Sequence, residues 1–240
     1  MLSTGAIYLM TSDRMTGALF LYALSVAARP FDAVIFIPMI TVWIYLNVKG
    51  GMTVRDMAGK LAPGIALGLT VALAIGLYNY VRFRNPLEFG HNYLPEFSFQ
   101  GGIQFSLSHI GNNAKTFIWG LPFDLTDGSL SLKKFGFSFL IACPVLTVML
   151  VSFVLDLIRK RMDMLRLVTI FIFMVHFFLL LLHRTFGGYQ FGARYCVDLL
   201  PYAFLYRLLQ KETTKTPVWE WIPLSLGFAF SVYGSIAMHL

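Results

Sequence analysis

Several apolar runs in this chain are long enough to cross a lipid bilayer, and they limit the folds that it can adopt. The clearest runs are Leu61–Tyr80, Phe137–Ile158, Leu165–His183 and Val218–Met238. A helix of roughly 20 apolar residues spans the hydrocarbon core of a membrane. Because no water satisfies the backbone there, the spanning segments are expected to be helical. The sequence therefore predicts an all-α, polytopic transmembrane helical bundle.

The composition agrees with a membrane protein. Hydrophobic residues make up 57% of the chain and charged residues 13%, whereas a soluble domain carries about 25% charged residues. The net charge is +7, but the basic residues lie in short turns between the apolar runs. That distribution is typical of topology signals. No nucleic-acid partner is therefore expected, and the predicted location is the cell membrane, with several passes.

Two further segments complete the predicted bundle. The region Met15–Tyr45 is interrupted at Arg29-Pro30. A straight helix would place Arg29 near the middle of the bilayer, which is unfavourable, so we expect two shorter helices that meet there. Cys196–Leu209 is a shorter apolar run. Together these runs predict about six or seven membrane segments in a single transmembrane domain that covers residues 1–240.

The basic turns predict the orientation of the bundle. If each apolar run crosses once, three turns rich in lysine and arginine share a side: Lys49–Lys60, Arg159–Arg166 and Arg207–Lys215. The positive-inside rule assigns that side to the cytoplasm. The outer side then carries Arg29 and the segments Val81–Phe135 and Arg184–Tyr195.

The outer segment from Arg82 to Lys134 is too long for a plain connection. Apolar residues recur in it at steps of three and four from Ile103 to Leu121. This period predicts an amphipathic helix of about five turns, ending near Trp119 and Pro122, that lies in the membrane interface.

Three stretches resemble the multi-span glycosyltransferases of the GT-C superfamily. They are YNYVRFRNPLEFGHNY at Tyr78–Tyr93, FGARYCVDLLPY at Phe191–Tyr202 and ALFLYALSVAARPFDAVIFIP at Ala18–Pro38. The likeness is to the C-terminal half of bacterial Rgt-type, aminoarabinose and protein O-mannosyltransferase-like enzymes. It implies transfer of a sugar from a polyprenyl-phosphate donor to a glycan, lipid or protein hydroxyl acceptor on the outer membrane face. It also implies that the chain is a fragment, because the catalytic carboxylate would lie before Met1.

The resemblance and the chemistry together select three arginines as lipid-phosphate ligands: Arg29, Arg194 and Arg82. Negative charge builds on the departing phosphate, and a guanidinium binds phosphate oxygens with two parallel donors. The alternative is interfacial snorkelling or structural ion pairs with Asp32 and Asp198.

Four residues are candidates for substrate contacts: Glu88, His91, Tyr93 and Tyr189. Glu88 could orient an acceptor hydroxyl, or it could fasten its own loop to Arg82. The aromatic side chains could contact a sugar ring, or they could be ordinary interfacial residues. No metal site and no cofactor are expected, because His176 and His183 share a helix face without an acidic or cysteine partner in register.

Two other functions stay open. A transporter or flippase subunit for lipid-linked glycans would need paired broken helices and facing polar residues at mid-bilayer, and the spans carry little charge at their centres. A non-catalytic membrane remnant is the other alternative.

Overall fold

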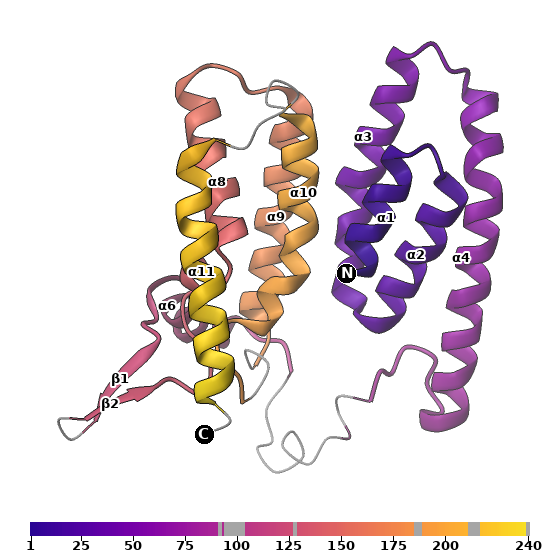
Figure 1. Cartoon of the computed structure of the whole chain (residues 1–240). Coiled ribbons are helices and arrows are strands. Elements are labelled where there is room, and N and C mark those ends of the chain that lie inside the picture. The colour runs from indigo at the N-terminus through magenta and orange to yellow at the C-terminus, as the bar shows by residue number, and fades with distance from the viewer. Residues whose placement is uncertain (91–92, 94–103, 127–128, 185–188, 211–216, 239–240) are drawn as a thin grey trace. The chain divides into compact units, whose positions relative to one another are not determined.

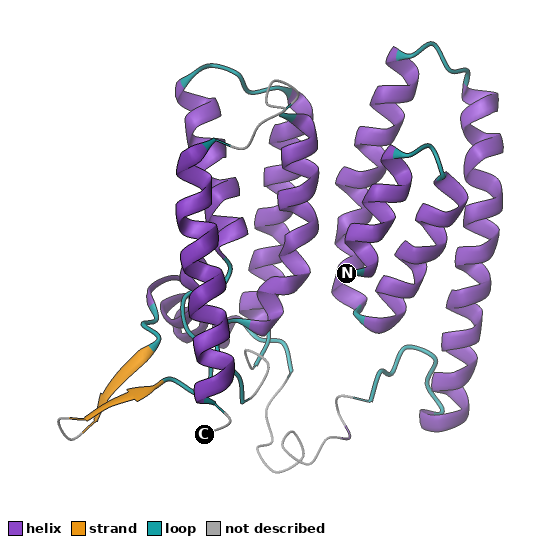
Figure 2. Ribbon diagram, viewed as in Figure 1, coloured by secondary structure: helices purple, strands orange, loops and turns teal. Residues whose placement is uncertain are grey.

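The computed structural model describes residues 1–90, 93, 104–126, 129–184, 189–210 and 217–238. The chain divides into two compact units, Met1–Gln104 and Phe105–Leu240, which are described separately. Helices make up most of each unit (Figures 1 and 2).

The first unit is a group of packed helices. They are α1 (Leu2–Thr11), α2 (Met15–Ala28), the 3-10 helix η1 (Pro30–Ile35), α3 (Phe36–Lys49) and α4 (Val54–Phe83). The helices α1 and α2 form a hairpin, and α2 packs along α4. The predicted break at Arg29-Pro30 is confirmed, since α2 ends at Ala28 and η1 begins at Pro30.

Helix α4 is longer than the predicted span Leu61–Tyr80. It begins at Val54 because the Thr53 side chain accepts a hydrogen bond from the Asp56 N–H and caps the helix. The basic residues Arg55 and Lys60 therefore lie in the first turns of α4 and not in a connecting turn.

The second unit is built around four longer helices. Its elements are η3 (Leu107–His109), α6 (Ile110–Trp119), β1 (Phe123–Thr126), β2 (Ser129–Leu132), α7 (Phe139–Ala142), α8 (Pro144–Ile158), α9 (Met164–Leu182), η4 (Arg194–Leu199), α10 (Leu200–Leu209) and α11 (Val218–Ala237). Helices α8, α9, α10 and α11 alternate in direction (Figure 1). Tyr202 and Tyr206 of α10 are fully buried among them with Phe173.

Two predicted spans of this unit are interrupted. Phe137–Ile158 is not one helix, because Pro144 lacks a backbone donor and α7 stops before it. Cys196–Leu209 is not one helix either, because it begins within the 3-10 turn η4 and continues as α10 from Leu200.

The segment that was predicted to be external also differs from the prediction. Its described helix is η3 followed by α6 and is shorter than five turns; Ile103 lies outside the described residues. Asn113, which the pattern assigns to the polar face, is buried. An antiparallel hairpin of β1 and β2 follows, with Phe123 opposite Leu132. The Asp-Gly sequence at 127–128 is typical of such connections, although these two residues lie outside the described part.

Three helical stretches in the described residues are long and apolar enough to span a membrane. They are Pro30–Lys49, Val54–Phe83 and Met164–Leu182, and the helices Met15–Ala28 and Pro144–Ile158 are apolar but shorter. The chain is therefore a helical membrane protein. The larger number of spans and the interfacial position of the amphipathic helix stay predictions.

Candidate functional site

Arg29 lies at the corner between α2 and η1. Its backbone is extended, and its side chain is half-buried. Asp32 is buried at the same corner, where its Oδ2 accepts a hydrogen bond from Ser25 Oγ. The Tyr22 hydroxyl donates to the Ala33 carbonyl oxygen at 2.9 Å. These contacts fix the corner and hold the Arg29 backbone in place.

Arg82 lies in the last turn of α4, the helix along which α2 packs (Figure 1). Gly64 faces Leu19 of α2, and Gly68 faces Ala23 four residues later. The two helices therefore run parallel over this length.

The loop after α4 folds back onto the end of the helix. Tyr93 stacks on Phe83 with ring centroids 5.0 Å apart, and the Arg82 guanidinium lies 4.9 Å from the centre of the same ring. Arg82 Nη1 also donates to the Tyr78 hydroxyl at 3.1 Å. An arginine and an exposed tyrosine thus share one aromatic ring.

Glu88 stabilises this loop from within. Its Oε1 accepts a hydrogen bond from the Gly90 N–H at 2.8 Å, and Gly90 has a positive φ of 84° that glycine adopts readily. Asn79, buried in α4, donates to the Pro86 carbonyl oxygen at 3.2 Å. The carboxylate of Glu88 therefore has a contact within its own loop, to the Gly90 backbone.

The second unit carries the other predicted residues at the end where α9 finishes and η4 begins (Figure 1). Arg194 is exposed, and its backbone N–H donates to Gln190 Oε1 at 3.0 Å. Tyr189 is exposed and meets Phe135 edge to face. Nothing in the described contacts joins Arg194 to Tyr189. His91 lies outside the described residues.

Asn113 holds the end of α9. Its Nδ2 donates to the carbonyl oxygens of Leu181 and His183, at 2.8 and 2.6 Å. The last carbonyls of a helix have no partner within the helix, so this side chain supplies one. The pattern of apolar residues gave no sign of this role.

We expect Asn113→Ala to lower the free energy of unfolding by about 2 kcal/mol, because two buried carbonyl oxygens lose their donor. Thermal unfolding in detergent measures this change. Asn112→Ala is the matched control, because Asn112 is the exposed neighbour on the same helix, and it should change stability by less than about 0.5 kcal/mol. Equal effects of the two variants would contradict the assigned role.

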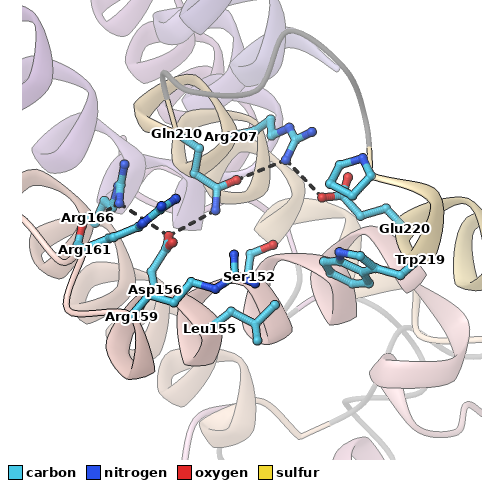
Figure 3. Close-up of a pocket in the computed structure, with 11 residues that line it drawn as sticks. Ser152, Leu155, Asp156, Arg159, Arg161, Arg166, Arg207, Gln210, Trp219 and Glu220 are labelled. Carbon is cyan, nitrogen blue, oxygen red and sulfur yellow. Dashed lines mark hydrogen bonds and ion pairs between the residues drawn. The ribbon is translucent and has the colours of Figure 1, made fainter.

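A polar pocket at the opposite end of the second unit was not predicted from the sequence. It has a volume of about 300 Å³ and lies among the ends of α8 and α10 and the first turns of α9 and α11 (Figure 3). Four arginines and two acidic residues line it. By the predicted orientation this end faces the cytoplasm.

Asp156 is the centre of a buried network beside this pocket. Its Oδ2 accepts hydrogen bonds from the Tyr206 hydroxyl at 2.8 Å and from Gln210 Nε2 at 3.1 Å. Arg166 Nη1 lies 3.5 Å from the same oxygen. The Arg166 Nη2 atom donates to the Leu209 carbonyl oxygen at 2.9 Å and so caps α10. These contacts fix the ends of three helices relative to one another.

The network continues to α11 through Arg207. Arg207 Nη1 donates to Gln210 Oε1 at 3.2 Å and to Glu220 Oε1 at 3.0 Å. The Glu220 side chain is only 6% exposed. Acidic residues embedded in apolar runs are energetically costly unless they are paired. The positions of Asp156 and Glu220 within apolar runs were therefore a sign in the sequence that each has a buried polar partner.

No group of three or more His, Cys, Asp or Glu side chains in the described part of the chain is placed to hold a metal ion. Buried His176 instead lies with Nδ1 3.1 Å from the Tyr202 hydroxyl. His183 is buried between the rings of Phe105 and Tyr195. Both histidines therefore have aromatic neighbours within the bundle.

Comparison with protein-family models, curated proteins and solved structures found no match for this chain.

Proposed function

We propose that this chain contributes to a membrane glycosyltransferase of the GT-C type. The enzyme would transfer a sugar from a polyprenyl-phosphate donor to a hydroxyl acceptor on the outer membrane face. The proposal depends on the sequence resemblance. One observation in the structure supports it further: Arg82 and Tyr93 share the ring of Phe83 at the C-terminal end of α4.

The chemistry explains why this arrangement suits a lipid phosphate. As the acceptor oxygen bonds to the anomeric carbon, the bond from that carbon to the phosphate oxygen breaks, and the polyprenyl phosphate leaves with added negative charge. A guanidinium held near that oxygen stabilises the charge. Arg82 is held by the Tyr78 hydroxyl and the Phe83 ring, so its side chain loses little conformational freedom when it binds a phosphate.

The other predicted residues have different parts in this proposal. Tyr93 is 65% exposed and offers a ring face to a sugar. Arg29, at the corner between α2 and η1, stays a candidate for contact with the phosphate. In the second unit, Arg194 stays a candidate for contact with a lipid phosphate and Tyr189 for contact with the substrate. The base that takes the acceptor's proton is not assigned to any residue of this chain.

Binding of polyprenyl phosphate to the protein in nanodiscs tests the proposal. We expect Arg82→Ala to weaken binding about tenfold, because a charge-assisted contact contributes about 1.5 kcal/mol. Arg82→Lys keeps the charge but loses the paired donors and should be intermediate. Native mass spectrometry of the bound lipid gives the affinities.

Arg55→Ala is the control. Arg55 is exposed in the first turn of α4, at the other end of the same helix, and its removal changes the net charge equally. We expect less than a twofold effect, since exposed charges farther apart than a Debye length are largely screened. If Arg55→Ala weakens binding as much as Arg82→Ala, or if the wild-type protein binds no polyprenyl phosphate, the proposed function is wrong.

A further inference from the structure

The polar pocket beside Asp156 has the features of an anion site. Its lining carries Arg159, Arg161, Arg166 and Arg207 against the two carboxylates of Asp156 and Glu220. Asp163 adds a third carboxylate next to Arg166, at 3.6 Å from its Nε. Positive charge therefore exceeds negative charge around the pocket, even with every acidic group of the network included.

Arg207 is held with part of its guanidinium still available. Both of its hydrogen bonds use Nη1, to Gln210 and Glu220, and its side chain is 35% exposed at the pocket. In the described residues, Nη2 and Nε contact no protein acceptor. These two donors have the fork geometry that binds two oxygens of a phosphate.

Arg159 supplies a second cation from another helix end. It follows α8 directly, is exposed and lines the pocket. Its guanidinium has no ion pair or hydrogen bond within the described part of the chain. Figure 3 shows Arg207 joining Gln210 and Glu220 in the network that includes Asp156, and Arg159 below that network.

An apolar groove adjoins the polar pocket. It has a volume of about 210 Å³, lies between α8, α10 and α11, and shares Ser152, Arg207, Gln210 and Glu220 with the pocket. Val148, Ala203 and other apolar side chains line the rest. A soluble phosphate would use only the polar part, whereas a phospholipid has both a charged headgroup and hydrocarbon chains. Basic pockets between membrane helices are known to suit acidic lipid headgroups.

We propose that this pocket binds an anionic phospholipid, with its phosphate between Arg207 and Arg159 and part of an acyl chain in the adjoining groove. The site lies on the predicted cytoplasmic side and is independent of the proposed glycosyltransferase function. The network around Asp156 positions Arg207, and so the bound lipid would join α8, α10 and α11.

Native mass spectrometry of the whole chain in detergent tests the proposal. The probes are phosphatidylglycerol, the zwitterionic phosphatidylcholine, and inorganic phosphate. We expect one phosphatidylglycerol to bind, with affinity at least tenfold above phosphatidylcholine. Arg159→Ala should weaken that binding about tenfold, because one charge-assisted contact is lost. Arg207→Lys retains a cation to pair with Glu220, so the variant should fold, but it lacks the paired guanidinium donors. We expect it to weaken phosphatidylglycerol binding about tenfold as well.

Two further variants separate the possible outcomes. Lys160→Ala removes an equally exposed charge one residue away that does not line the pocket, and we expect less than a twofold change. Val148→Phe fills the apolar groove and should weaken lipid binding about tenfold without changing unfolding temperature. Equal losses for Lys160→Ala and Arg159→Ala would show diffuse charge attraction and overturn the proposal. The lipid assignment would be overturned if inorganic phosphate binds and phosphatidylglycerol does not, or if Val148→Phe leaves lipid binding unchanged.

Discussion

Replacing Asp156 with alanine is expected to lower the free energy of unfolding of the second unit by about 3 kcal/mol, because it leaves the buried Arg166 with only the more exposed carboxylate of Asp163 as an acidic partner. The Asp156 and Arg166 side chains are both only 11% exposed. The change also removes the acceptor of Tyr206 and Gln210. Thermal unfolding in detergent, with hydrogen exchange of α9 and α10, measures the loss.

The control for this prediction is a lysine–aspartate ion pair at the surface of the first unit. Lys60 Nζ lies 2.5 Å from Asp13 Oδ2, but the Asp13 side chain is 64% exposed. Asp13→Asn should therefore change stability by less than about 1 kcal/mol. Asp156→Asn keeps the shape and the acceptor oxygen, so its effect should lie between the two. A loss for Asp156→Ala no larger than that for Asp13→Asn would contradict the central role of the network.

We expect the second large effect at two glycines of α11. The buried residues of this helix are Glu220, Gly227 and Gly234, which are spaced by seven and so form one line along the helix. A Cβ at Gly227 would lie 2.2 Å from Pro144 Cγ, and one at Gly234 would lie 2.0 Å from the Phe191 ring. Small residues allow membrane helices to approach this closely.

Gly227→Ala and Gly234→Ala should each lower the free energy of unfolding by about 2 kcal/mol, because the added methyl group forces backbone or ring shifts. The double variant should separate α11 from α8, which limited proteolysis after Leu209 and hydrogen exchange of α11 would detect. Gly59→Ala is the control, since nothing lies within 4 Å of a Cβ there. It should instead stabilise α4 by about 0.5 kcal/mol, as alanine favours a helix over glycine. Destabilisation by Gly59→Ala of similar size would contradict the packing argument.

The candidate sites differ in how well a sequence could reveal them. Arg29 and Arg82 were selected from motifs, and the structure places Arg29 at the corner after α2 and Arg82 in the last turn of α4. The pocket beside Asp156 was missed. Its signal was present, as acidic residues in apolar runs, but the pattern names no partner for them. The glycosyltransferase activity stays a prediction.

The sequence by itself determined what depends on neighbours along the chain. The long apolar runs established a helical membrane protein, Arg29-Pro30 ended α2, and the bounds of α9 and α11 lie within a residue of those predicted. These features follow from hydropathy and backbone geometry over one or a few turns.

The tertiary structure decided which polar groups meet. Tyr206 reaches Asp156 across 50 positions, and Asn113 reaches the end of α9 across 70. Gly227 and Gly234 matter because Pro144 and Phe191 lie against them. Such contacts depend on how helices pack side by side, and a bilayer makes any unmatched polar group there costly. Their partners therefore became visible only once the helices were placed together.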